Sequence, residues 1–150
     1  YRDRSTSVDV RLAGFNFNRN ATDQPVYRID LPDGTGDYDI RAAFGEPAYV
    51  CTDDYYEFKD TSSVLQTIDH SGGIAGGSKW IDATDVLRTS ESDWVNNNAR
   101  ARLTFATTIF NTVIGRGGAS TGQSKIAYLS IEKVAGGGPT GNPWYYYAQQ

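Results

Sequence analysis

Alternation of apolar and polar residues is the strongest pattern in the chain, and it is clearest between Val26 and Glu46. In the first half of this segment the apolar positions are Tyr27, Ile29 and Leu31. After a Pro/Gly-rich turn at 32–36, the apolar positions are Tyr38, Ile40, Ala42 and Phe44. A period of two is typical of a half-buried antiparallel strand. The segment therefore predicts two strands joined as a hairpin.

The same alternation predicts strands along most of the chain. They are Ser7–Ala13, Asp54–Lys59, Ser63–Ile68, Trp80–Thr84, Arg100–Ala106, Ile109–Ile114 and Ile126–Val134. The loops between them are rich in glycine and polar residues, and the longest span 71–78 and 115–124. Short strands with such turns and no helical period indicate an all-β fold, so we expect an antiparallel jelly-roll β-sandwich of about eight or nine strands.

One segment, Ser90–Asn98, offers an alternative to this all-β interpretation. It opens like a capped helical turn, because a serine precedes two acidic residues. It ends in three consecutive asparagines, which have low helix propensity and favour turns. We therefore expect a loop here rather than a helix.

Length and composition divide the chain into one domain with an arm at each end. A chain of 150 residues is one domain by the usual size of domains, and we expect the sandwich at 8–134 and an N-terminal arm at 1–7. A C-terminal arm at 135–150 begins with a linker that is flexible by composition, Gly136–Pro143. Because the sequence starts at Tyr1 and has no Met, we expect a processed chain or part of a longer protein.

The C-terminal arm ends in a dense aromatic cluster, Trp144, Tyr145, Tyr146 and Tyr147. Trp and Tyr dominate the residues that carry binding energy at protein interfaces. We therefore predict that this cluster binds a partner surface. It would dock either on its own sandwich or on a neighbouring copy, and we favour the neighbour.

Charge and cysteine content exclude several classes of function. The formal net charge is -4 and the basic residues are scattered, so we expect no nucleic-acid partner, which would need a concentrated positive patch. The sequence has no apolar run of about 18 residues, so we expect no membrane span. Cys51 is the single cysteine, which excludes an intrachain disulfide and a Cys-x-x-Cys metal or redox site.

Four segments, taken in order, resemble galactose-binding-like jelly-roll domains. They are Gly36–Arg41, Phe44–Glu46, Trp80–Thr84 and Ile126–Glu132, and the resemblance covers about Val8 to Val134. Such domains occur as carbohydrate-binding modules and as accessory domains of extracellular and bacteriophage structural proteins. The resemblance thus implies a sandwich with an extracellular or virion-surface location. None of the four segments is a catalytic signature, and a fold by itself does not specify an activity.

The residues that could support catalysis point away from an enzyme. His70 is the single histidine, and its neighbours Asp69 and Ser71 cannot form a triad with it, because triad members converge from separate segments. A distant Ser and Asp could still converge on His70. Carboxylate pairs for a glycosidase are available among Asp53, Asp54, Glu57, Asp82, Asp85, Glu91 and Asp93, but 18 acidic residues produce such pairs by chance. We expect no catalytic residues.

Two kinds of binding site remain as hypotheses. A glycan site would use aromatic rings together with amide side chains, and the candidates are Trp80, Trp94, Tyr55, Asn96 and Asn97. A structural Ca²⁺ would use the carboxylates of Asp53 and Asp54, although aspartates in turns also cap their own backbone. We expect no other cofactor.

Taken together, the sequence favours a non-catalytic structural or adhesive subunit of an extracellular assembly, in particular a virion surface or decoration protein. It would form a homo-oligomer or join a larger protein assembly through its terminal arms. The alternative is a carbohydrate-binding module that recognises a glycan through loop aromatics. A small glycan-cleaving enzyme is a third hypothesis.

Overall fold

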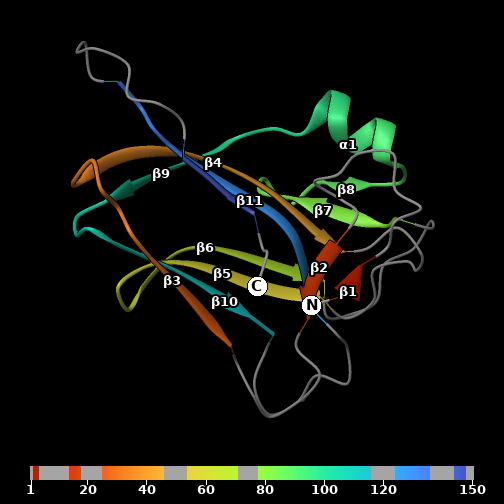
Figure 1. Cartoon of the computed structure of the whole chain (residues 1–150), viewed down its shortest axis with the longest axis horizontal. Helices are drawn as coiled ribbons and strands as arrows, with labels where there is room; N and C mark the ends of the chain where they lie inside the picture. Colours follow the sequence, from red (N-terminus) through yellow and green to blue (C-terminus); the bar gives the residue numbers. More distant parts are fainter. Residues whose placement is uncertain are drawn as a thin grey trace.

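The computed structural model of the chain is an all-β antiparallel sandwich of two sheets, as the alternation predicted (Figure 1). It describes residues 25–45, 54–70, 78–115 and 124–135 with their side chains, and residues 2–3, 14–17 and 144–147 as backbone. Within these ranges there are 12 strands and one short helix. The strand count exceeds the prediction because several strands are only two to four residues long, too short for alternation to reveal.

The larger sheet is built around two long central strands, β4 (Gly36–Gly45) and β11 (Lys125–Lys133). Its strand order is β1-β2-β11-β4-β7-β8. The outer members of this order are β1 (Arg2–Asp3), β2 (Gly14–Phe17), β7 (Trp80–Asp82) and β8 (Leu87–Arg88). In addition, β9 (Ala101–Phe105) pairs with β4, and β12 (Trp144–Tyr147) pairs with β11.

The smaller sheet has the order β3-β10-β5-β6 and packs against one face of the larger sheet. Its strands are β3 (Val26–Asp30), β10 (Ile109–Ile114), β5 (Asp54–Asp60) and β6 (Ser63–His70). The core between the sheets is aromatic. Phe44 of β4 stacks on Tyr56 of β5 with ring centroids 3.9 Å apart, and both side chains are fully buried. This stack joins the central strands of the two layers.

The predicted hairpin between Val26 and Glu46 is wrong, because β3 and β4 belong to different sheets. β3 pairs with β10, and the turn that follows carries the chain across to the larger sheet. Gly34 and Gly36 have φ angles of +76° and +122°, which favour glycine in this crossing. The alternation correctly marked Ile29 and Leu31 as buried, but it carries no information on which strand is the partner.

The chain also crosses between the sheets from β9 to β10, and this crossing lies beside the one from β3 to β4. The backbone N–H of Leu31 in the first donates to the carbonyl of Thr108 in the second, at 2.7 Å. The buried carboxylate of Asp60 accepts from the N–H groups of Ala106 and Thr107. These bonds satisfy backbone groups that no strand partner reaches.

The loop predicted at Ser90–Asn98 is also wrong, because Glu91–Asn97 forms helix α1. The side chain of Ser90 caps the helix by accepting from the N–H of Asp93 at 3.1 Å, and Trp94 is buried against the sheet. The cap and this burial outweigh the low helix propensity of the asparagines. Nowhere in the described parts of the chain is a helix long and apolar enough to cross a membrane.

The remaining predicted strands agree with the structure to within a few residues, except Ser7–Ala13, which lies outside the described residues. The terminal segments that are described both join the larger sheet. β1 pairs with β2, and β12 pairs with β11 in the register Ile131↔Trp144 to Tyr128↔Tyr147. The backbone of the C-terminal cluster thus lies on its own sandwich, the less favoured of the two positions, and docking on a second copy stays a prediction.

The aromatic contact between the layers predicts a large loss of stability on truncation. Replacing Phe44 with alanine (Phe44→Ala) removes the ring that stacks on Tyr56, and we expect the free energy of unfolding to fall by about 3–5 kcal/mol in urea denaturation. Val64→Ala is the control, because this side chain is 48% exposed, and it should change the value by less than about 0.5 kcal/mol. Similar values for both variants would contradict the assigned core.

Candidate functional site

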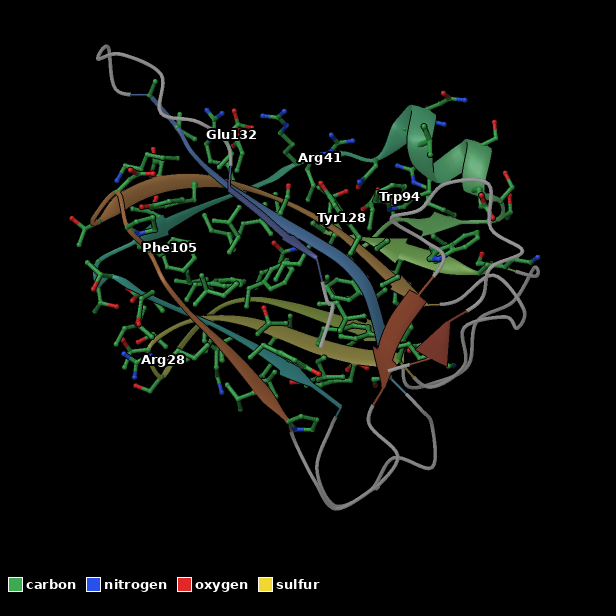
Figure 2. The ribbon with its side chains drawn as sticks, viewed as in Figure 1. Arg28, Arg41, Trp94, Phe105, Tyr128 and Glu132 are labelled. Carbon is green, nitrogen blue, oxygen red and sulfur yellow. The ribbon has the colours of Figure 1, made fainter. Side chains whose placement is uncertain are left out.

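Polar side chains gather on the face of the larger sheet that points away from the smaller one, which we call the outer face (Figure 2). In β4 the residues alternate, so that Tyr38 and Ile40 enter the core while Asp39 and Arg41 point outward. The outer face is formed by Asp37, Asp39, Arg41, Arg100, Arg102, Thr104, Tyr128, Ser130 and Glu132. Helix α1 covers the end of this face next to β7 and β8.

The uncovered part of the outer face is a ladder of paired charges. Arg102 binds Asp39 with two hydrogen bonds, Nε to Oδ1 at 2.8 Å and Nη2 to Oδ2 at 3.0 Å. Arg100, which directly precedes β9, contacts carboxylates on both β11 and β4. Its Nη1 lies 2.7 Å from Oε2 of Glu132 and 3.7 Å from Oδ2 of Asp39. These pairs follow the strand register, in which Asp39 lies opposite both Arg102 and Glu132. The hydrogen bonds from Arg102 hold the pKa of Asp39 below its ordinary value.

The covered part of the outer face has its own small apolar core. Trp94 of α1 meets the ring of Tyr128 edge to face, with centroids 5.6 Å apart, and Trp80, Ala43 and Ala127 complete the cluster. The indole N–H of Trp94 donates to the carbonyl oxygen of Ala42 at 3.0 Å. Ala42 lies between the part of β4 that pairs with β9 and the part that pairs with β7. Trp94 therefore lies at the point where the neighbour of β4 changes from β9 to β7.

A buried ion pair ties α1 to the β7–β8 hairpin. The side chain of Asp82 is fully buried and accepts two hydrogen bonds from Arg88, Nε to Oδ2 at 3.1 Å and Nη2 to Oδ2 at 2.8 Å. Its other oxygen accepts from the backbone N–H groups of Thr84 and Val86. Arg88 also donates to the carbonyl oxygen of Asn97, the last residue of α1. Asp82 is one of the seven acidic residues available for a glycosidase pair, and both of its carboxylate oxygens accept hydrogen bonds within this hairpin.

A separate apolar pocket of about 220 Å³ opens beside the turn between β3 and β4. It is lined by Ile29, Asp30, Leu31, Pro32, Asp33, Tyr38 and Ile131. The ammonium group of Lys133 lies 4.7 Å from the centroid of the ring of Tyr38, one of the lining residues. With so few polar groups, this pocket suits an apolar side chain rather than a reaction.

The structure separates the residues predicted to bind a glycan. Trp80 and Trp94 are 1% and 0% exposed, so neither ring presents an open face. Asn96 and Asn97 are exposed on α1, where the amide nitrogen of Asn97 donates to Asp93. Tyr55 lies on the smaller sheet, half-buried, and its hydroxyl donates to Glu57. The five side chains therefore do not form one platform.

The remaining predictions concern a metal site, the single histidine and the C-terminal aromatic cluster. Asp54 is fully buried and accepts a hydrogen bond from the hydroxyl of Tyr56 at 2.7 Å, whereas Asp53 lies outside the described residues. Across the described ranges, no group of three or more His, Cys, Asp or Glu side chains could hold a metal ion. His70 contacts Asp85, with Nε2 2.6 Å from Oδ1, and no serine hydroxyl in the described ranges bonds to it. For Trp144, Tyr145, Tyr146 and Tyr147 the structure gives the backbone pairing alone.

Comparison with known proteins gives no relative from which a site could be transferred. No protein-family model matches the chain, and no match was found among curated proteins or among solved structures.

The ladder on the outer face predicts a pH dependence of stability. Because the pKa of Asp39 is lower in the folded protein than its ordinary value of 3.8, its ion pair stabilises the fold at neutral pH and is lost as pH falls through the lowered pKa. We expect the difference in unfolding free energy between wild type and Asp39→Asn to be constant above about pH 5 and to shrink below about pH 4. A difference that grows on acidification in urea titrations would contradict this assignment.

The bond between Trp94 and Ala42 predicts a stability effect that is separate from packing. Trp94→Phe keeps a ring against Tyr128 but leaves the buried carbonyl of Ala42 without its donor, so we expect a loss of about 1–3 kcal/mol. Val95→Ala, on the same helix and 38% exposed, is the matched control and should be nearly neutral. Equal stability of Trp94→Phe and wild type in denaturant titration would remove this bond from the account.

Proposed function

We propose that this protein is a non-catalytic structural or adhesive subunit of an extracellular assembly, of the kind found on virion surfaces or as decoration proteins. In this proposal the sandwich is of the galactose-binding-like jelly-roll type and is the rigid body. Its terminal strands provide the attachment to neighbouring subunits. The observation that carries the proposal is that segments from both ends of the chain pair along the same edge of β11.

The edge of β11 that pairs with β2 and β12 is one that a strand from another copy could occupy. β2 pairs with residues Lys125 and Ile126, and β12 pairs with the next part of the strand, Tyr128 to Ile131. Both contacts are backbone ladders, which any strand of suitable sequence could replace. If β12 of one copy withdraws, the exposed hydrogen-bonding groups of β11 form a template for β12 of another copy.

The connection that precedes β12 is long enough for such an exchange. Ten residues, 134–143, separate β11 from β12, and four of them are glycine and two proline. An extended chain spans about 3.3–3.6 Å per residue, so this connection could reach about 33–36 Å. That distance is comparable with the diameter of a small domain. The same strand could therefore bind its own sandwich or that of an adjacent subunit.

Carbohydrate binding is the second candidate function. Burial of Trp80 and Trp94 takes away the stacking platform on which the sequence hypothesis relied. The exposed amide of Asn96 still offers a hydrogen-bonding group at the surface. This function ranks below docking because its predicted residues lie on different parts of the molecule.

Truncation tests whether the C-terminal strand is needed for assembly. Deleting Gly136 to Gln150 removes the linker and β12, and we expect oligomers or particle attachment to be lost in light scattering coupled to size exclusion. A deletion of residues 148–150 leaves β12 in place and should assemble like wild type. If the variant with the longer deletion assembles fully and has a normal circular dichroism spectrum, the proposal is wrong.

Cross-linking tests whether the strand is exchanged between copies. Ser130 and Tyr145 lie opposite each other in the register, so Ser130→Cys with Tyr145→Cys in a Cys51→Ser background should form a disulfide. In assembled material we expect covalent dimers or a ladder of oligomers on a non-reducing gel. Assembled protein that runs only as a cross-linked monomer would show that the strand stays on its own sandwich, and would contradict docking by exchange.

A further inference from the structure

The apolar pocket beside the turn between β3 and β4 has a buried floor and an exposed rim. Four buried side chains form the floor: Ile29, Leu31, Tyr38 and Ile131. Three exposed residues form the rim: Asp30, Pro32 and Asp33. Because the rim is exposed, a group outside the sandwich can reach the floor. A reachable pocket with an apolar floor and a few polar groups at its mouth is a binding site for an apolar group.

The turn that forms one wall of the pocket is held in place by hydrogen bonds. The hydroxyl of Tyr38 donates to the carbonyl oxygen of Gly34 at 2.6 Å. The backbone N–H of Gly34 donates to the carbonyl oxygen of Leu31 at 3.3 Å, and the ammonium group of Lys133 donates to that of Thr35. None of these bonds needs a ligand. The wall is therefore formed in advance, which lowers the cost of binding.

The pocket joins the smaller sheet to the strand that receives β12. Ile29 of the floor comes from β3, which is the terminal strand in the order of the smaller sheet. Ile131 of the floor comes from β11, on which β12 pairs. The pocket therefore lies where an edge of the smaller sheet meets the strand proposed to be the docking edge.

The register of β12 places Trp144 next to the pocket. Trp144 lies directly opposite Ile131. Residues opposite each other in an antiparallel pair share a face of the sheet, and their Cβ atoms are about 4.5–5.5 Å apart. Ile131 is on the inner face, in the core and in the floor of the pocket, so position 144 is on the inner face too. The next position, Tyr145, lies opposite Ser130 on the outer face.

The size and chemistry of the pocket suit an indole ring. Its volume is about 220 Å³. An apolar cavity of about 150 Å³ is large enough to bind benzene, and indole is a benzene ring fused to a five-membered ring. The one polar group of indole is an N–H donor, and the rim carries two carboxylates, which are acceptors, from Asp30 and Asp33.

We propose that this pocket binds the indole ring of Trp144 and so selects β12 as the strand that occupies the edge of β11. In strand addition the backbone hydrogen bonds provide affinity, and pockets for side chains provide specificity. The register is the same when β12 comes from a neighbouring copy, and for that case the inference rests on the docking function proposed above. For β12 of the same copy it does not depend on that function.

Titration of the full chain with free indole tests the pocket. Trp144→Ala removes the proposed occupant, so we expect indole to bind this variant and to shift the methyl signals of Ile29 and Ile131 in NMR spectra. Wild type and Tyr145→Ala keep Trp144 and should bind indole at least about tenfold more weakly. If indole binds wild type as tightly as Trp144→Ala, or fails to bind Trp144→Ala at millimolar concentrations, the proposal is wrong.

Fluorine NMR gives a second readout on the wild-type sequence. Protein that contains 5-fluorotryptophan should give three signals, from Trp80, Trp94 and Trp144, and the signal missing in Trp144→Phe belongs to Trp144. We expect a soluble paramagnetic agent to broaden the Trp144 signal about as little as the signals of the two fully buried tryptophans. Strong broadening of the Trp144 signal alone would show its ring in solvent and contradict the proposal.

Assembly separates failure of this inference from failure of the docking function. Trp144→Ala should raise the dissociation constant of the assembly by about tenfold or more in light scattering, because a large apolar group loses its burial. Tyr145→Ala is the matched control on the opposite face of the same strand and should change the constant by less than about threefold. Equal effects of the two variants would refute the pocket and leave docking by β12 intact. A filled pocket in a protein that does not assemble would confirm the pocket and refute the docking function.

Discussion

The pairing of β4 with β11 is the contact on which the larger sheet and the proposed docking edge depend. The two strands share seven register pairs, and the other strands of the larger sheet attach to one of them directly or through a neighbour. One side of this pair faces the core through Ile40 and Leu129, and the other carries Arg41 opposite Ser130. The outer edge of β11 receives the terminal strands. The other edge of β4 is divided between β7 and β9, and Trp94 binds the backbone at that division.

The division of β4 also explains why a helix interrupts an otherwise all-β chain. β9 pairs with Gly36 to Ile40 and β7 with Ala43 to Gly45, so the backbone between these registers needs another partner. Trp94 supplies it, and the Asp82–Arg88 ion pair holds the helix over the gap. A buried pair of this kind is costly to break once formed, because a single remaining charge would be unpaired. The helix therefore completes the hydrogen bonding of β4 at this division.

The sequence predicted strands and their buried faces well, because alternation is a local property of a half-buried strand. The sequence did not predict where the chain crosses from one sheet to the other. The turn after Leu31 has the same Pro/Gly chemistry in a hairpin as in a crossing between sheets, and the deciding contacts, such as Leu31 with Thr108, are distant in sequence. It failed again at α1, where burial of Trp94 outweighs the asparagines that follow. In both cases tertiary contacts overrode local preference.

The ion pairs of the outer face could not be predicted from the sequence, for a related reason. Arg41, Arg100 and Arg102 are the same residue type on the same face, each next to apolar positions in an alternating segment. What distinguishes them is whether a carboxylate 32 or 63 residues away in the chain lies opposite, as it does for Arg100 and Arg102. A charged residue in a strand is usually interpreted as part of a solvated face, and for those two this is correct. Arg41 differs because the register places Ser130, and not a carboxylate, opposite it on β11.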